Sequence, residues 1–141
     1  MEKYFFFDDI REAPEVNWVV ARDVPTAQEI LSKTAFDIWS LDHDIGFQMM
    51  CEKCQKEIGY DGIVLDAMLL SKLREGCNHA LNGTHLAAWA LDNIQVWPQL
   101  IIIHSANPYG AERMRDMLST KTNCTIMNYA TLKYVVRVNR K

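Results

Sequence analysis

The chain has 141 residues, of which 49% are hydrophobic and 23% are charged. This length and composition are typical of one soluble globular domain and argue against a disordered or fibrous protein. The formal net charge of -3 gives no electrostatic basis for broad binding to double-stranded nucleic acid.

The sequence also argues against a membrane protein. No run approaches the roughly 20 apolar residues that span a bilayer. The apolar stretch 4–7 is too short for a signal peptide and is followed at once by two acids. We therefore expect a cytoplasmic protein without a membrane partner. Four cysteines in that compartment favour a metal site or catalysis over disulfides.

Short apolar runs alternate with helical spacing along most of the chain. We expect parallel strands at 4–7, 18–21, 36–41 and 100–103, and a last strand at either 125–127 or 134–136. Such alternation predicts a single α/β domain, residues 1–141, with a parallel sheet and right-handed crossovers.

The predicted helices lie between these strands. Thr26 is a candidate N-cap, and Glu29 completes a capping box at the start of a helix that ends near residue 34. Further helices are expected over 85–94 and from residue 110 onward. Residues 63–70 fit either a buried helix or a strand, and we favour the helix.

The connection after the third strand is too long for a simple crossover, so we expect an insertion at 47–84. It contains a Cys-x-x-Cys pair and a later Cys-x-His pair: Cys51, Cys54, Cys77 and His79. Three thiolates and an imidazole form a ligand set for structural Zn²⁺. Ordinary buried thiols and an exposed histidine remain the alternative. Cys124 stands apart and is expected in the core.

Three of the predicted strands end in chemically active residues. Asp8 and Asp9 follow the first, Asp42, His43 and Asp44 follow the third, and His104 follows the fourth. Carboxyl ends of parallel strands form the ligand crevice of such sheets. Carboxylates suit Mg²⁺ or Mn²⁺, so Asp8, Asp9 and Asp42 are the candidate ligands of a divalent ion. The alternative is that some of these acids are solvated helix caps.

The imidazoles suggest proton transfer at the same edge. His43 and Asp44 would orient or activate water, and His104 would act as general acid. The side chains expected to bind a phosphate are those of Ser105, Asn107 and Arg113. The alternatives are that the histidines are structural hydrogen-bonding groups and that Arg113 pairs with a surface acid.

The motifs FFFDDIR, SLDHDIG, GYDG and IIHSANPYGAERM resemble those of the cyclic-phosphate-processing receiver-like family of bacteria and phages. The resemblance covers nearly the whole chain. It implies a flavodoxin-like sheet of order 2-1-3-4-5 and a role in handling cyclic phosphates, such as nucleotide or RNA 2′,3′-cyclic ends. In receiver domains Asp42 would be the phosphoacceptor and Ser105 the hydroxyl residue. The lysine expected after the last strand is not clearly matched, since Lys133 lies in another context.

We therefore predict a metal-assisted phosphoesterase that acts on a cyclic phosphate. One alternative is a non-catalytic module that binds a cyclic nucleotide or an RNA end, as in phage counter-defence. Another is a signalling receiver phosphorylated on Asp42. A phospho-relay domain does not need Asp44 or the two histidines, so these residues favour phosphoester chemistry.

Overall fold

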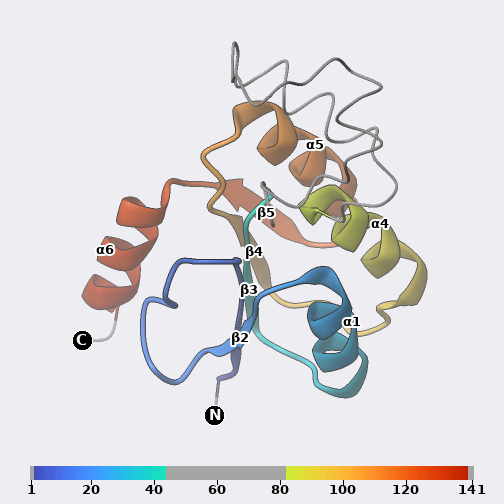
Figure 1. Ribbon diagram of the computed structural model, residues 1–141, viewed down its shortest axis with the longest axis horizontal. Coiled ribbons are helices and arrows are strands. Elements are labelled where there is room, and N and C mark those ends of the chain that lie inside the picture. Colours follow the sequence, from blue (N-terminus) through green and yellow to red (C-terminus); the bar gives the residue numbers. More distant parts are fainter. Residues whose placement is uncertain (1, 44–81, 140–141) are drawn as a thin grey trace, which may run out of the picture.

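The computed structural model describes residues 2–43 and 82–139, which contain one five-stranded parallel sheet with helices on both faces (Figure 1). The strands are β1 (Tyr4–Phe7), β2 (Val19–Ala21), β3 (Ile38–Leu41), β4 (Leu100–Ile103) and β5 (Asn123–Ile126). Their order is β2-β1-β3-β4-β5. The predicted α/β class and strand order are confirmed.

The register places the ends of the central strands side by side. Phe7 of β1 pairs with Leu41 of β3, and Leu41 pairs with Ile103 of β4. The residues that follow these three strands therefore leave the sheet at one common edge. Of the two candidates for the last strand, 134–136 is wrong, because these residues lie in a helix. From that helix, Val136 packs against the buried cluster on one face of the sheet.

Three helices cover one face of the sheet: α1 (Val24–Lys33), α4 (Gly83–Asn93) and α5 (Pro108–Leu118). The remaining described helix, α6 (Tyr129–Asn139), lies on the other face (Figure 1). The predicted N-cap of α1 is wrong. Asp23, not Thr26, caps the helix, because its Oδ1 accepts a hydrogen bond from the Thr26 amide at 2.8 Å. Pro25 fits the first turn, where its missing N–H has no cost.

The two faces have separate cores. On the three-helix face, side chains of β1, β3 and β4 pack against α1, α4 and α5; the buried strand residues are Phe5, Phe7, Trp39, Leu41, Ile101 and Ile103. On the α6 face, the buried cluster is smaller and consists of Phe6, Trp18, Ile102 and Leu132. Alternate residues of one strand point to opposite faces, so β1 and β4 each contribute buried side chains to both cores.

Several predictions fall on residues that are not described. The candidate zinc ligands Cys51, Cys54, Cys77 and His79, the segment 63–70 and Asp44 all lie outside the described residues.

Cys124 is half-buried against the core of the three-helix face, and burial raises its pKa to about 11. Among the described helices, none has the length and apolar character needed to cross a bilayer.

Candidate functional site

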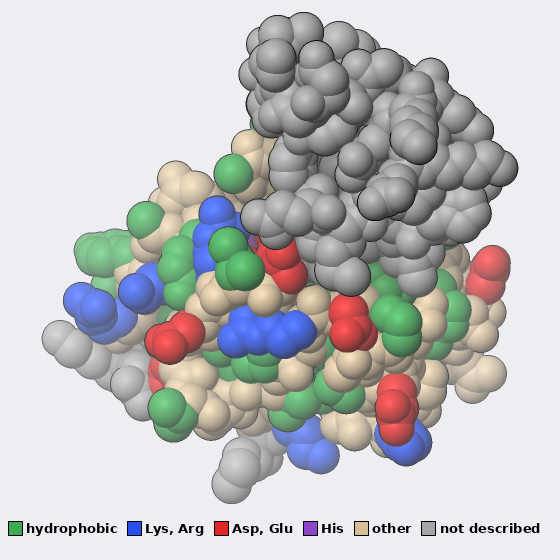
Figure 2. Space-filling view, in the orientation of Figure 1, with side chains coloured by type: hydrophobic (Ala, Val, Ile, Leu, Met, Phe, Trp, Pro, Cys, Tyr) green, Lys and Arg blue, Asp and Glu red, His purple; other side chains and the backbone are tan. Residues whose placement is uncertain are grey.

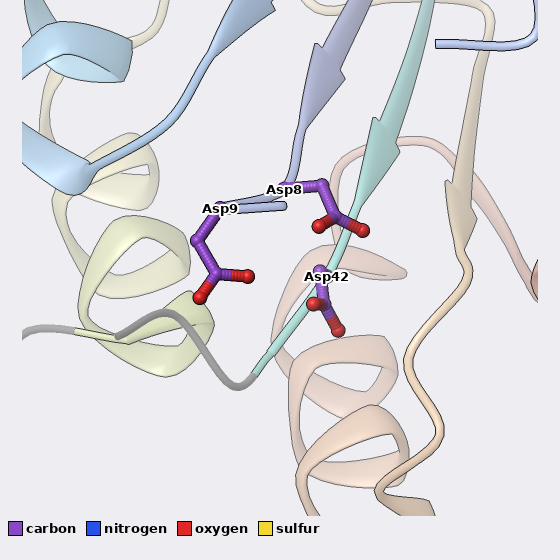
Figure 3. A group of neighbouring side chains, drawn as sticks. All are labelled: Asp8, Asp9 and Asp42. Atoms are coloured by element: carbon purple, nitrogen blue, oxygen red, sulfur yellow. The ribbon is translucent and has the colours of Figure 1, made fainter. Parts of the chain in front are cut away.

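Three carboxylates meet at the carboxyl edge of the sheet. Asp8 and Asp42 are the first residues after β1 and β3, and Asp9 extends beside them (Figure 3). One oxygen from each of the three side chains lies within 4.8 Å of the others. Asp8 is 0% exposed and Asp42 is 6% exposed. The structure therefore brings together the three acids that the sequence singled out, and two of them are buried.

Asp8 is held as an anion by hydrogen bonds. Its Oδ1 accepts from the amides of Ile10 (3.0 Å) and Arg11 (2.9 Å), and its Oδ2 lies 2.9 Å from Nε2 of His104. Burial raises the pKa of this carboxyl, but the His104 hydrogen bond and the two amides outweigh burial and lower the pKa to about 2. Asp8 is thus ionised at neutral pH.

The pKa of Asp42 is shifted in the opposite direction from that of Asp8. Burial, followed by repulsion from the Asp8 carboxylate, raises its pKa to about 6. The amide of His43, which donates to Oδ1 at 2.8 Å, compensates only in part. A second negative charge beside Asp8 is therefore costly, and a cation would stabilise it. An all-carboxylate donor set fits a hard divalent ion such as Mg²⁺ or Mn²⁺.

His104 lies beneath the carboxylates, on the α6 face. The ring is 1% exposed and stacks on Phe6, with centroids 4.7 Å apart. Its Nδ1 lies 2.8 Å from Oγ of Ser40. An ionised carboxylate can only accept, so Nε2 carries the proton toward Asp8. The contacts Ser40–His104–Asp8 resemble the serine, histidine and aspartate of a catalytic triad. However, Ser40 lies within β3 and is 0% exposed, so its hydroxyl cannot reach a substrate. The chain of contacts therefore orients Asp8.

His43 faces away from this chain of contacts. Its Nε2 lies 3.0 Å from Oγ1 of Thr84, and Nδ2 of Asn107 lies 3.3 Å from its Nδ1. The ring is 0% exposed and packs on Gly110 so closely that a Cβ there would lie 2.4 Å from Cγ of the ring. His43 thus joins the end of β3 to the beginnings of α4 and α5.

The other predicted phosphate ligands belong to the start of α5. Asn107 is the N-cap, since its Oδ1 accepts from the Gly110 amide at 3.0 Å. Oγ of Ser105 accepts from the Asn107 amide at 3.1 Å. Both side chains are 8% exposed. Arg113 is exposed on α5. Ser105 and Asn107 therefore stabilise the start of α5. Their predicted binding of phosphate remains a prediction.

Sequence reasoning missed three residues that the fold brings to these groups. Ser40 and Thr84 contact the two histidines, and Arg11 lies beside the acids. The only signal for Ser40 is a hydroxyl within an apolar run. Arg11 follows Asp8 by three residues, a spacing that suits an aspartate whose side chain accepts from the amides after it. Thr84 has no such signal.

Comparison with known proteins agrees with the receiver-like fold. The family model described as cyclic-phosphate processing receiver domain matches residues 3–120. Neither a curated protein nor a solved structure matches the chain.

Proposed function

The chain belongs to the cyclic-phosphate processing receiver domain family, and we propose that it is a metal-assisted phosphoesterase. In the proposed reaction, water adds to the phosphorus of a cyclic phosphate, one ring P–O bond breaks, and the leaving alkoxide takes up a proton. The observation that supports this proposal best is the group of three carboxylates within 4.8 Å at the edge of the sheet.

In this proposal, Asp8, Asp9 and Asp42 bind one divalent ion. The ion, when bound, would neutralise the developing charge on phosphate oxygens. Asp8 is prepared for this role because His104 and two backbone amides keep its carboxylate charged and fixed in orientation. Asp42 supplies a second buried oxygen ligand, and Asp9 supplies a third that is half-buried.

The two histidines are positioning residues in this proposal. Both nitrogens of His104 contact protein groups, Ser40 and Asp8, and the ring is 1% exposed. In this arrangement His104 acts through Asp8, whose carboxylate it orients. His43 fixes the segment after Asp42 through Thr84 and Asn107. The general-acid role of His104 and the water-activating roles of His43 and Asp44 remain sequence predictions.

The proposed substrate is a nucleotide or an RNA end that carries a cyclic phosphate. On the face shown in Figure 2, Lys and Arg side chains alternate with Asp and Glu, and the described residues there form no continuous basic surface. Recognition would therefore be local, at the acidic edge, and would not require the long basic track that binds a polynucleotide backbone.

A substrate panel tests the proposal. We expect turnover of a 2′,3′-cyclic nucleotide or a cyclic dinucleotide in the presence of Mg²⁺ or Mn²⁺, and a decrease of about 100-fold or more in Asp42→Asn, which loses a charged ligand. Asp116→Asn, an exposed acid on α5, is the matched control.

Three results would contradict the proposal. The first is no turnover of any member of the panel. The second is saturable binding of a ligand that is recovered intact, which indicates a binding module. The third is stable incorporation of phosphate from acetyl phosphate that is lost in Asp42→Asn, which indicates a signalling receiver.

A further inference from the structure

We infer that Arg11 is an internal counter-ion of the two buried carboxylates, Asp8 and Asp42, and competes with the divalent ion for them. The inference rests on the proposed ion site but not on turnover. Nη1 of Arg11 lies 3.5 Å from Oδ2 of Asp8 and 3.9 Å from Oδ2 of Asp42. The guanidinium thus supplies part of the charge that a bound ion would supply.

The backbone of Arg11 is fixed by hydrogen bonds, whereas its side chain is partly exposed. Its amide donates to Oδ1 of Asp8 at 2.9 Å, and its carbonyl accepts from Nη1 of Arg22. The side chain is 33% exposed, and its contacts with the carboxylates are longer than an ideal charged hydrogen bond. A strong ion can therefore displace the guanidinium without unfolding the loop.

Tyr129 lies beside the Arg11 side chain in the arrangement that also places it next to the carboxylates. The guanidinium carbon of Arg11 lies 5.4 Å from the centre of the Tyr129 ring, within the range of a cation–π contact. Nζ of Lys133 lies 5.5 Å from the same ring. Two cations therefore flank the aromatic side chain next to the acidic edge.

Displacement would give Arg11 a second use. A guanidinium that no longer neutralises carboxylates presents donors in a planar fork, which suits bidentate binding of a phosphate. Because Arg11 is anchored through Asp8, the phosphate would be held beside the ion. Ion binding and phosphate binding would then be coupled, so each would be favoured in the presence of the other.

The test is a calorimetric titration of the whole chain with Mn²⁺ alone. We expect Arg11→Gln to bind Mn²⁺ about fivefold more tightly than the wild type, since a partly exposed competing charge is removed. Arg11→Lys keeps the charge and should remain within about twofold. Lys133→Gln is the matched control, because it removes a cation from the same Tyr129 ring and should also change affinity by less than about twofold.

A second titration measures inorganic phosphate at saturating Mn²⁺. Here Arg11→Gln should bind phosphate about fivefold more weakly than the wild type, because the bidentate donor is lost. Tighter Mn²⁺ binding together with weaker phosphate binding in Arg11→Gln would show that Arg11 exchanges the carboxylates for phosphate. Circular dichroism verifies that each variant is folded.

Each outcome separates this inference from the proposed function. Unchanged Mn²⁺ affinity in Arg11→Gln overturns the inference and leaves the phosphoesterase proposal intact. Tighter Mn²⁺ binding without turnover of any cyclic phosphate supports the inference and contradicts the phosphoesterase. No Mn²⁺ binding to either protein contradicts both.

Discussion

The two faces of the sheet differ in what they bury. The three-helix face is packed by aromatic and aliphatic side chains from the strands and from α1, α4 and α5. The α6 face has a smaller apolar cluster and also buries Ser40 and His104 directly beneath the carboxylates. Hydrophobic stabilisation is therefore concentrated on one face, and the other face accommodates polar groups that orient Asp8.

The pleat of the strands explains this division. Asp8, Asp42 and His104 are two residues beyond Phe6, Ser40 and Ile102, so their side chains point to the α6 face as well. The face that carries the acids must therefore also carry the groups that satisfy them. We therefore expect mutations on the three-helix face to change mainly the stability of the fold. Mutations on the α6 face should also change the electrostatics of the acidic edge.

The largest expected effect compares neighbouring isoleucines of β4. Ile103 is 0% exposed on the three-helix face, and Ile102 is 4% exposed on the α6 face. Ile103→Ala should lower the free energy of unfolding by about 4 kcal/mol, because the tightly packed residues around it cannot fill the cavity that the lost side chain leaves. Ile102→Ala should lower it by about 2 kcal/mol, because Ile102 lines an open surface pocket and is less closely packed. Urea denaturation measures both, and equal losses would show that the faces are equally packed.

The next effect tests the polar groups of the α6 face. His104→Leu removes the donor to Oδ2 of Asp8 and leaves a buried charge less well satisfied, so we expect a loss of about 3 kcal/mol at pH 7. Ser40→Ala removes only the contact with Nδ1 and should cost about 1 kcal/mol. Denaturant unfolding of both variants gives the comparison. A larger loss in Ser40→Ala would mean that the hydroxyl, and not the contact with Asp8, dominates this cluster.

The third effect is a pH dependence at Asp42. Its folded pKa of about 6 exceeds the ordinary 3.8, so this group contributes stability that is fully present below pH 3.8 and is lost as the pH rises through 6. Asparagine does not ionise, so Asp42→Asn removes this loss of stability at high pH. Without divalent ions, we expect the variant to be more stable than the wild type by about 2 kcal/mol at pH 7.5, and the difference to disappear near pH 4.

Thermal unfolding at the two pH values measures this difference. Asp8 changes in the opposite sense: its pKa of about 2 gives stability that is present above pH 3.8 and lost as the pH falls through 2. Asp8 is retained in both proteins, so its contribution is common to them. A variant that is less stable than the wild type at pH 7.5 would refute the electrostatic account of Asp42.

The smallest expected effect is at an exposed ion pair. Nζ of Lys33 lies 3.1 Å from Oε1 of Glu29 on α1, and both side chains are about 70% exposed. Lys33→Ala should change the free energy of unfolding by less than about 0.5 kcal/mol, because solvent screens the pair. A larger loss by urea denaturation would mean that surface charges, and not only buried ones, contribute strongly to the stability of the three-helix face.

Much of the fold could be predicted from the sequence because the central strands are short apolar runs that end in polar residues. The last strand was ambiguous because 134–136 is rich in β-branched residues, which strands and amphipathic helices both use. The start of α1 was missed because Asp23 and Thr26 are both good N-caps. Family membership was recognisable from the motifs that follow the strands.

The candidate site was predictable only in part. Parallel strands with aligned ends bring Asp8 and Asp42 together, and that needs no detailed register. The opposite directions of Asp42 and His43 follow from the strand pleat but were not anticipated. The contact of Ser40 with His104 joins residues 64 positions apart. Such a contact depends on strand register, which local patterns do not specify.

The Gly83 amide donates to the carbonyl of His43 at 2.8 Å, and this contact has a consequence for protein engineering. His43 and Gly83 are therefore adjacent in space although they are far apart in the sequence. Loop-closure free energy grows only slowly with loop length. A linker that joined these two residues would therefore have only a short distance to span.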